Sequence, residues 1–212
     1  MRTFITSLVL SVAITTQAQT FRQIEPGVYL LVAGQEDAHT PLRYKEPVAK
    51  QLKDMPATDN PFAKEGVHIE VNARGCVVDI PLAADENIYG FGLQMGSFVQ
   101  NNKKKRPLVN DHPLKDLGYT HAPQPFYISN KGYAVLINTA RYTTFYIGTN
   151  RKNTDYTPSE DSQKAKLSTD ELYRSSTQSS SKPRVQVDIP GAKGISVLVF
   201  AGPDMNSALR RY

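Results

Sequence analysis

The stretch Pro125-Phe-Tyr-Ile-Ser-Asn-Lys-Gly-Tyr-Ala-Val-Leu-Ile-Asn138 predicts a β-hairpin. Aromatic and β-branched residues fill Phe126 to Ser129 and Tyr133 to Asn138, as is typical of strands. Between them lies Asn130-Lys131-Gly132, a short turn with Asn and Gly, which accept positive φ angles at low steric cost. Two strands joined this tightly indicate an antiparallel sheet.

Other parts of the chain show the same strand signals. Apolar and polar residues alternate along Val67 to Asn72 and Val185 to Ile189, which places the apolar side chains on one face of each strand. Short β-branched or aromatic runs bounded by Gly, Pro or Asn predict strands at 27–33, 143–148 and 194–200. Helical periodicity is scarce, so the sequence predicts an all-β fold, an antiparallel β-sandwich.

Three segments interrupt this pattern. Tyr44 to Lys64 is polar and dotted with proline, which predicts a long excursion with at most a helical turn. The charged segment from Thr154 to Glu171 and the serine-rich segment from Ser175 to Ser181 are predicted to be loops, because neither can bury enough apolar area to order strongly by itself.

The last residues predict the start of a helix over 203–212. Asp204 or Asn206 could cap this helix, and Ala208 to Arg211 would continue it. Because the sequence ends inside the predicted helix, we expect a longer parent protein, in which residues 19–202 form the sandwich domain.

The first 18 residues have the features of a secretory signal peptide. Arg2 is a positive n-region, Phe4 to Ile14 is apolar and almost uncharged, and Thr16-Gln17-Ala18 places small residues at the cleavage position. The apolar run is shorter than the roughly 20 residues that span a bilayer. No other segment approaches that length. We therefore expect no transmembrane segment and export to the periplasm or the extracellular medium.

Composition limits the partners. Cys76 is the single cysteine, which forbids an internal disulfide and predicts a buried structural thiol. Much of the net charge of +5 comes from Lys103 to Arg106, predicted to be a solvated loop, with an acidic glycan or cell-surface polymer as its alternative partner. An exported protein rarely meets nucleic acid, so no nucleic-acid partner is expected.

Several clusters fit no catalytic or cofactor-binding pattern. The glycines of Tyr89-Gly-Phe-Gly-Leu-Gln-Met-Gly96 are spaced wrongly for a dinucleotide loop and are predicted to be structural. No pair of carboxyl groups suited to glycoside hydrolysis stands out, so no catalytic residue is assigned. The spacing of Asp111, His112, Asp116 and His121 matches no closed zinc site. We expect neither a metal nor a cofactor.

Four phrases occur in order along the chain: Glu86-Asn-Ile-Tyr-Gly-Phe-Gly-Leu-Gln94, Val109-Asn-Asp-His-Pro113, the hairpin stretch 125–138, and Phe200-Ala-Gly-Pro203 with Arg211-Tyr212. Together they resemble the N-terminal galactose mutarotase-like domain of glycoside hydrolase family 31. The resemblance implies a supersandwich fold. It also implies a catalytic barrel directly after this domain, whose nucleophile and acid/base aspartates are absent from this chain.

The resemblance therefore implies a non-catalytic domain of a secreted α-glycosidase, which shapes the substrate site of the barrel. The substrate would be an α-linked oligosaccharide and the barrel an intramolecular partner. Most members of the family are retaining α-glycosidases, and some are transglycosylases or lyases. A loop of this domain reaches the barrel mouth in the family, and Asn110 and Asp111 resemble its substrate-binding tip. Val109 stands where the family often has an aromatic residue, and His121-Ala122-Pro123 resembles an insertion.

Two other classes stay open. A free-standing carbohydrate-binding sandwich would also fit the strands, but it predicts a cluster of exposed aromatic rings, and the chain has no tryptophan. A small aldose epimerase would need its own His and Glu pair, and His121 has no evident partner in the sequence.

Overall fold

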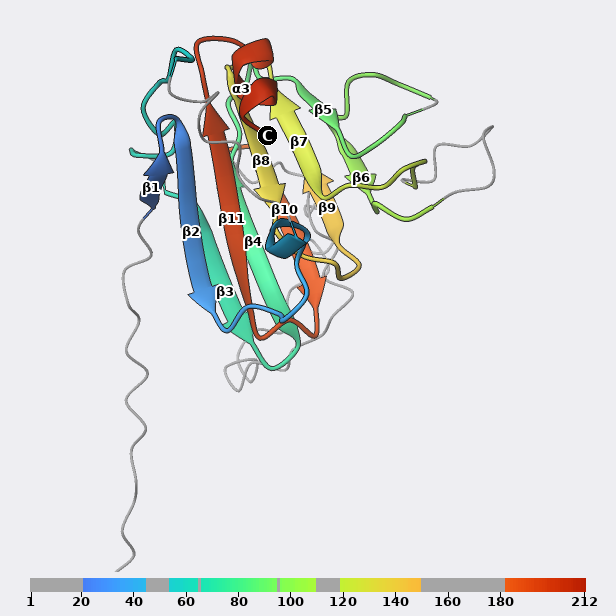
Figure 1. Ribbon diagram of the computed structural model, residues 1–212. Coiled ribbons are helices and arrows are strands. Elements are labelled where there is room, and N and C mark those ends of the chain that lie inside the picture. Colours follow the sequence, from blue (N-terminus) through green and yellow to red (C-terminus); the bar gives the residue numbers. More distant parts are fainter. Residues whose placement is uncertain (1–20, 45–53, 65, 95, 110–118, 150–181) are drawn as a thin grey trace, which may run out of the picture.

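The computed structural model describes residues 21–44, 54–64, 66–94, 96–109, 119–149 and 182–212, and their strands form two packed sheets (Figure 1). The six-stranded sheet contains, in spatial order, β1 (Arg22–Glu25), β2 (Val28–Gly34), β11 (Gly194–Ala201), β8 (Tyr133–Ile137), β7 (Phe126–Ser129) and β5 (Ile88–Gly90). The five-stranded sheet contains β3 (His68–Asn72), β4 (Gly75–Pro81), β10 (Arg184–Pro190), β9 (Thr144–Ile147) and β6 (Lys103–Lys105). The predicted all-β antiparallel sandwich is confirmed.

The predicted hairpin is β7 and β8. Phe126 pairs with Leu136 and Ser129 with Tyr133, so the ladder closes on the turn at 130–132. Gly132 has a φ angle of 79°, the conformation that the turn requires. The strands expected at 27–33, 67–72, 143–148, 185–189 and 194–200 are also present, with bounds shifted by one or two residues.

The prediction of a solvated loop at Lys103 to Arg106 is wrong. Lys103 to Lys105 form the edge strand β6, which pairs with β9 in the register Lys104 to Tyr146. Successive side chains of a strand point to opposite faces, so Lys104 is exposed whereas Lys105 is 1% exposed. Three identical residues hide this alternation in the sequence, because period-two patterns are recognised from changes in polarity.

The main core lies between the two sheets. It is built from the inward-facing residues of both, including Leu31, Val78, Val135, Val187 and Val197, all buried. Cys76 belongs to this core and its thiol donates to the backbone oxygen of Ala192 at 3.6 Å, which confirms a structural thiol. Burial of this apolar surface is the main source of stability in a domain without disulfides.

A second apolar cluster covers the outer face of the six-stranded sheet. It contains Val28, Phe126, Ile128, Leu198 and Phe200 from the strands, and the C-terminal helix α3 (Met205–Arg211) packs against it. The one-turn 3-10 helix η1 (Pro41–Tyr44) also contributes a residue, Leu42. As a result β8 and β11 are buried on both faces, which is unusual for antiparallel strands.

The opposite outer face, on the five-stranded sheet, is polar. There Asp79 of β4 accepts from the guanidinium of Arg184 and from the Gln186 amide of the neighbouring strand β10. Within the described residues the two outer faces of the sandwich therefore differ in chemistry: the six-stranded sheet has an extended apolar cluster beneath α3 and η1, and the five-stranded sheet has polar side chains.

The C-terminal helix begins where the sequence predicts. Asp204 is the N-cap with extended backbone angles, and its carboxylate accepts from the Ser207 backbone amide at 2.7 Å. The hydrogen bond lowers the pKa of the Asp204 carboxyl group. The predicted signal peptide at 1–18 and the predicted loops at 154–171 and 175–181 lie outside the described residues.

Candidate functional site

The predicted substrate-binding residues, Asn110 and Asp111, lie outside the described residues. The structure does describe the chain on both sides of segment 110–118. Val109 and Thr120 form an isolated parallel bridge, in which the Thr120 backbone amide donates to the Leu108 oxygen at 2.9 Å. The two ends of the segment are therefore fixed next to one another. Val109 itself is 68% exposed.

A second bridge supports the same place. The Leu93 amide donates to the His121 oxygen at 2.8 Å, and the His121 amide donates back to Leu93 at 3.3 Å. We call the described residues 93–94, 106–109 and 119–122 the loop base. Sequence reasoning missed this arrangement because its members are short, irregular and far apart in the chain.

An unusual backbone turn brings Leu93 to the loop base. Gly90, Phe91 and Gly92 have φ angles of 122°, 66° and 96°, three positive values in succession. Phe91 is a bulky residue in the left-handed region, and its buried ring packs edge-on against Phe145 with centroids 4.8 Å apart. A Cβ atom on Gly92 would lie 2.4 Å from the Ala122 oxygen. The structural role predicted for these two glycines is confirmed.

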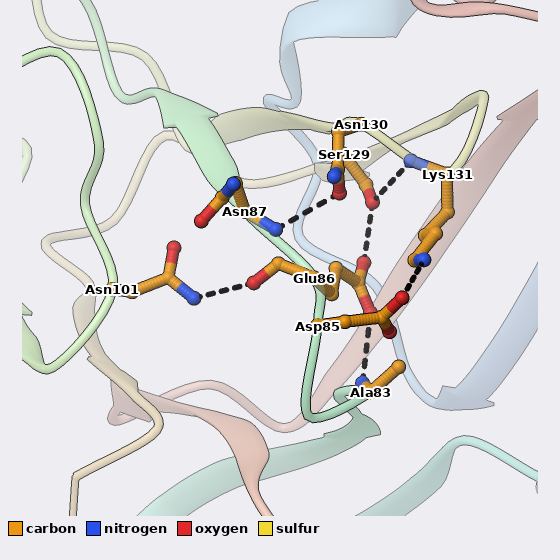
Figure 2. A network of polar contacts seen from close by, with 8 residues as sticks. All are labelled: Ala83, Asp85, Glu86, Asn87, Asn101, Ser129, Asn130 and Lys131. Carbon is orange, nitrogen blue, oxygen red and sulfur yellow. Dashed lines mark hydrogen bonds and ion pairs between the residues drawn. The ribbon is translucent and has the colours of Figure 1, made fainter.

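Glu86, four residues before this backbone turn, is the centre of a polar network (Figure 2). Its carboxylate is 4% exposed and accepts from the Ala83 amide at 2.9 Å, from the Ser129 hydroxyl at 2.5 Å and from the Tyr133 hydroxyl. Its backbone oxygen accepts from the Asn101 side chain at 2.6 Å. A carboxylate held by three donors fastens the chain before β5 to the β7–β8 turn.

Two further contacts in Figure 2 join these elements. The Asn87 amide donates to the Asn130 side chain at 2.9 Å, and the Lys131 ammonium pairs with Asp85 at 2.5 Å. This ion pair lowers the pKa of the Asp85 carboxyl group. These contacts hold residues 85–87 to the β7–β8 turn and to Asn101. The network is therefore an anchor for the start of the sequence 86–94, which leads to the loop base.

A hollow of about 810 Å³ lies beside the loop base, on the apolar outer face of the six-stranded sheet. Its walls include Leu108, Val109, Pro123, Tyr142 and Tyr212. Tyr142 is 75% exposed. At the rim, the Arg141 guanidinium donates two hydrogen bonds to the Asp37 carboxylate, at 2.6 and 2.8 Å.

The opposite charges of Arg141 and Asp37 neutralise each other at the rim. The hydrogen bond from Arg141 holds the pKa of Asp37 below its usual value. The remaining walls of the hollow are mostly proline, aliphatic and aromatic surface. Such a surface can bury apolar groups of a partner, or stack against the ring of a sugar.

Of the four residues weighed as metal ligands, only His121 is described, and its backbone forms the bridge to Leu93. Within the described ranges no group of three or more His, Cys, Asp or Glu side chains is placed to hold a metal ion. In the same part of the chain, no helix has the length and apolar composition needed to cross a bilayer.

Comparison with known families gives one match. The sequence model of the family described as glycosyl hydrolase 31 N-terminal galactose mutarotase-like domain matches residues 25–145, more than half of the chain. The matched range includes the hairpin, the anchor at Glu86 and both stems of the loop base. Comparison with curated protein sequences finds no match.

Solved structures with a similar arrangement share little sequence with this chain. A dextranase from Flavobacterium johnsoniae is 16% identical, with a TM-score of 0.47 over 92% of this chain and 20% of its own. A xylosidase from Aspergillus niger is 16% identical, with a TM-score of 0.38 over 69% of this chain and 15% of its own. A cycloalternan-degrading enzyme from Trueperella pyogenes is 15% identical, with a TM-score of 0.41 over 70% of this chain and 19% of its own. This chain spans a fifth or less of their lengths.

Proposed function

Because the chain belongs to the family of N-terminal galactose mutarotase-like domains of glycosyl hydrolase 31, we propose that it is the non-catalytic first domain of an exported α-glycosidase. In this role it shapes the substrate site of a catalytic barrel and takes no part in proton transfer or nucleophilic attack. The family match over residues 25–145 is the observation that carries the proposal. The signal-like pattern of residues 1–18 supports export.

The apolar outer face of the six-stranded sheet is the proposed contact surface for the barrel. An antiparallel sheet in a solvated sandwich normally keeps one face polar, as the five-stranded sheet does here. The other sheet has a second apolar cluster, and the hollow with exposed Val109 and Tyr142 extends it. Helix α3 and η1 already cover this cluster, so a second domain packed here would remove from water the hollow beside them, with its exposed Val109 and Tyr142.

The loop base lies at the edge of this surface. Val109 belongs both to the wall of the hollow and to the bridge that fixes segment 110–118. A barrel packed over the hollow would therefore meet the two described ends of segment 110–118, which carries Asn110 and Asp111. We propose that Asp111 accepts a hydrogen bond from a sugar hydroxyl next to the cleaved bond. A hydrogen bond to a charged group contributes about 1.5 to 3 kcal/mol.

The free-standing carbohydrate-binding module is less well supported. It requires neighbouring exposed aromatic rings on which sugars can stack. Among the described residues, the most exposed aromatic side chains are Phe98 and Tyr142. Phe98 contacts Tyr89, with ring centroids 5.7 Å apart and tilted planes, and Tyr142 lies on the wall of the hollow. Nothing in this arrangement favours a flat sugar platform over a docking surface.

The proposal is tested by comparing two proteins. The purified 212-residue chain and the complete product of its gene are assayed against nitrophenyl α-glycosides and α-linked oligosaccharides. We expect hydrolysis only by a product that contains a barrel, because the chain has no assigned acid pair. Turnover by the repurified chain alone would contradict a non-catalytic role. A gene product that ends at Tyr212 would contradict the parent enzyme.

A further inference from the structure

The basic run Lys103 to Arg106 has a structural use that its charge does not reveal. Lys104 faces outward, where its ammonium lies 5.3 Å from the centre of the Tyr146 ring. Lys105 faces inward and is 1% exposed. A buried ammonium is costly unless hydrogen bonds replace its water, so its neighbours must be polar and well placed. The Lys105 ammonium donates to the side-chain oxygen of Gln94 at 2.9 Å.

From Lys105 a chain of side-chain hydrogen bonds runs into the loop base. The ammonium donates to the Gln94 Oε1 atom, and the Gln94 Nε2 atom donates to the Thr120 hydroxyl at 3.1 Å. The Thr120 oxygen in turn lies 2.8 Å from the backbone oxygen of Leu93 and 3.0 Å from that of His121. The chain therefore ends on both strands of the bridge beside segment 110–118.

The ammonium sets the direction of this chain. Lysine can only donate, so the Gln94 oxygen must face it and the Gln94 amide nitrogen must face Thr120. The Thr120 hydroxyl then accepts from Gln94 and keeps its own hydrogen for a backbone oxygen. Three side chains that each could adopt several orientations are thereby reduced to one arrangement, and bonds ordered in this way reinforce one another.

The backbone turn before Gln94 is what brings it within reach. Three successive positive φ angles at residues 90–92 take the chain out of β5 and across the loop base. At the crossing, a Cβ atom on Gly92 would lie 2.9 Å from the Thr120 hydroxyl. The close approach of Gly92 to Thr120 and the hydrogen-bond chain through Gln94 therefore depend on the same backbone turn.

We propose that Lys105 is a positioning residue, which through Gln94 and Thr120 fixes the two stems between which segment 110–118 lies. The sugar contact of Asp111 rests on the proposed function, whereas the fixing of the stems does not. Lys105 touches no sugar in this proposal. Its effect reaches Asp111 through the backbone of the loop base.

Hydrogen exchange of the full chain, followed by NMR or by mass spectrometry of short peptides, tests the fixing of the stems. Lys105→Met keeps the length of the side chain and removes the donor, and Thr120→Val keeps the shape and removes the hydroxyl. Thr143→Val is the matched control, because Thr120 and Thr143 are both 3% exposed. The informative amides are those of Leu93, Thr120 and His121, which form the two bridges.

We expect both variants to exchange these three amides about fivefold faster or more, which is the effect of losing one buried hydrogen bond. Amides of β8 and β11 should exchange as in the unchanged chain, and Thr143→Val should leave the loop base unaltered. Unchanged exchange at the loop base, or an equal acceleration in β8 and β11, would overturn the proposal. If Lys105→Met does not fold, Thr120→Val decides alone.

A double-mutant cycle in the complete gene product tests the link to Asp111. If Lys105 acts by placing Asp111, then Lys105→Met should lower kcat/KM in the unchanged enzyme but have little further effect in Asp111→Asn. Additive losses would overturn that link. The exchange experiment uses no sugar, so its result stands even if the gene product proves to have no glycosidase activity.

Discussion

The ring of Tyr212 stacks on the ring of Phe126, with centroids 3.9 Å apart and planes 21° from parallel. The Tyr212 hydroxyl also donates to Gln124 at 2.8 Å. Helix α3 is thereby attached to the outer face of the six-stranded sheet at its C-terminal end. We expect Tyr212→Ala to lower the free energy of unfolding by about 2 kcal/mol, since a partly buried aromatic ring is lost.

Urea denaturation measures this change, and Leu209→Ala is the control on the same helix. Leu209 is 50% exposed, so its removal should cost no more than about 0.5 kcal/mol. Equal losses in the two variants would show that the stacked rings add nothing to the attachment of α3.

Substitution of Glu86 tests the anchor before β5. Glutamine has the same shape, but its amide group cannot accept on both sides, so one buried donor among Ala83, Ser129 and Tyr133 loses its partner. We expect Glu86→Gln to lower the free energy of unfolding by about 1.5 to 3 kcal/mol. Glu70→Gln, at an exposed position of β3, should change it by less than about 0.5 kcal/mol. Thermal and urea unfolding compare the two; equal stability of both variants contradicts an anchor at Glu86.

Glycine at position 92 is expected to be obligatory. Gly92 has a positive φ angle, and an added Cβ would lie 2.4 Å from the Ala122 oxygen and 2.6 Å from the His121 oxygen. Gly92→Ala should therefore lower the free energy of unfolding by about 2 to 3 kcal/mol. Gly66→Ala is the control, because a Cβ atom added there would have nothing within 4 Å. Denaturation midpoints that shift equally would argue against the close crossing at the loop base.

Stability should decrease at high pH because of two buried tyrosines. Burial raises the pKa of Tyr127 and of Tyr133 well above the usual value, and Glu86 adds to the rise for both. In the unfolded chain a tyrosine ionises near pH 10. Below that pH both states are protonated and the free energy of unfolding is unaffected. Above it the unfolded state alone loses protons, so stability falls as pH rises towards the folded pKa values.

Tyr127→Phe separates the two tyrosines. Within the described residues the Tyr127 hydroxyl is buried without a hydrogen-bond partner, so its removal should leave stability near neutral pH unchanged or slightly higher. The same change should make the loss of stability above about pH 10 less steep. Urea midpoints across this range, with tyrosinate absorbance as the second signal, measure both effects. An unaltered slope would contradict the assignment to Tyr127.

The sequence predicts most of the fold because the relevant signals are local. The β7–β8 hairpin shows apolar runs and a short turn with Asn and Gly within one stretch, and the cap at Asp204 lies three residues from the amide that it binds. Strand β6 escapes prediction because its polarity does not change from residue to residue. The apolar outer face of the six-stranded sheet is not predicted either. The sequence of a strand buried on both faces, such as β11, does not show which element covers each face.

The candidate site is less accessible to sequence reasoning. The tip residues Asn110 and Asp111 come from a resemblance, because no physical pattern distinguishes a sugar-binding Asn-Asp pair from an ordinary turn. Gln94, Lys105 and Thr120 meet only in three dimensions, and each residue type is common on surfaces. Their contact could not be predicted, because Gln94 follows a turn with positive φ angles at 90–92, one of which belongs to a phenylalanine.

The order of the strands also has a consequence for biosynthesis. Strand β11 lies between β2 and β8, and β10 lies between β4 and β9, so the strands of this domain that the ribosome makes last occupy interior positions in both sheets. A nascent chain that has reached only β9 leaves β2 unpaired with β8 and β4 unpaired with β9. The five-stranded sheet cannot close before residue 190 is available, nor the six-stranded sheet before residue 201, and long-range pairing of this kind forms slowly. The domain therefore cannot complete its two sheets until nearly all of it has been translated.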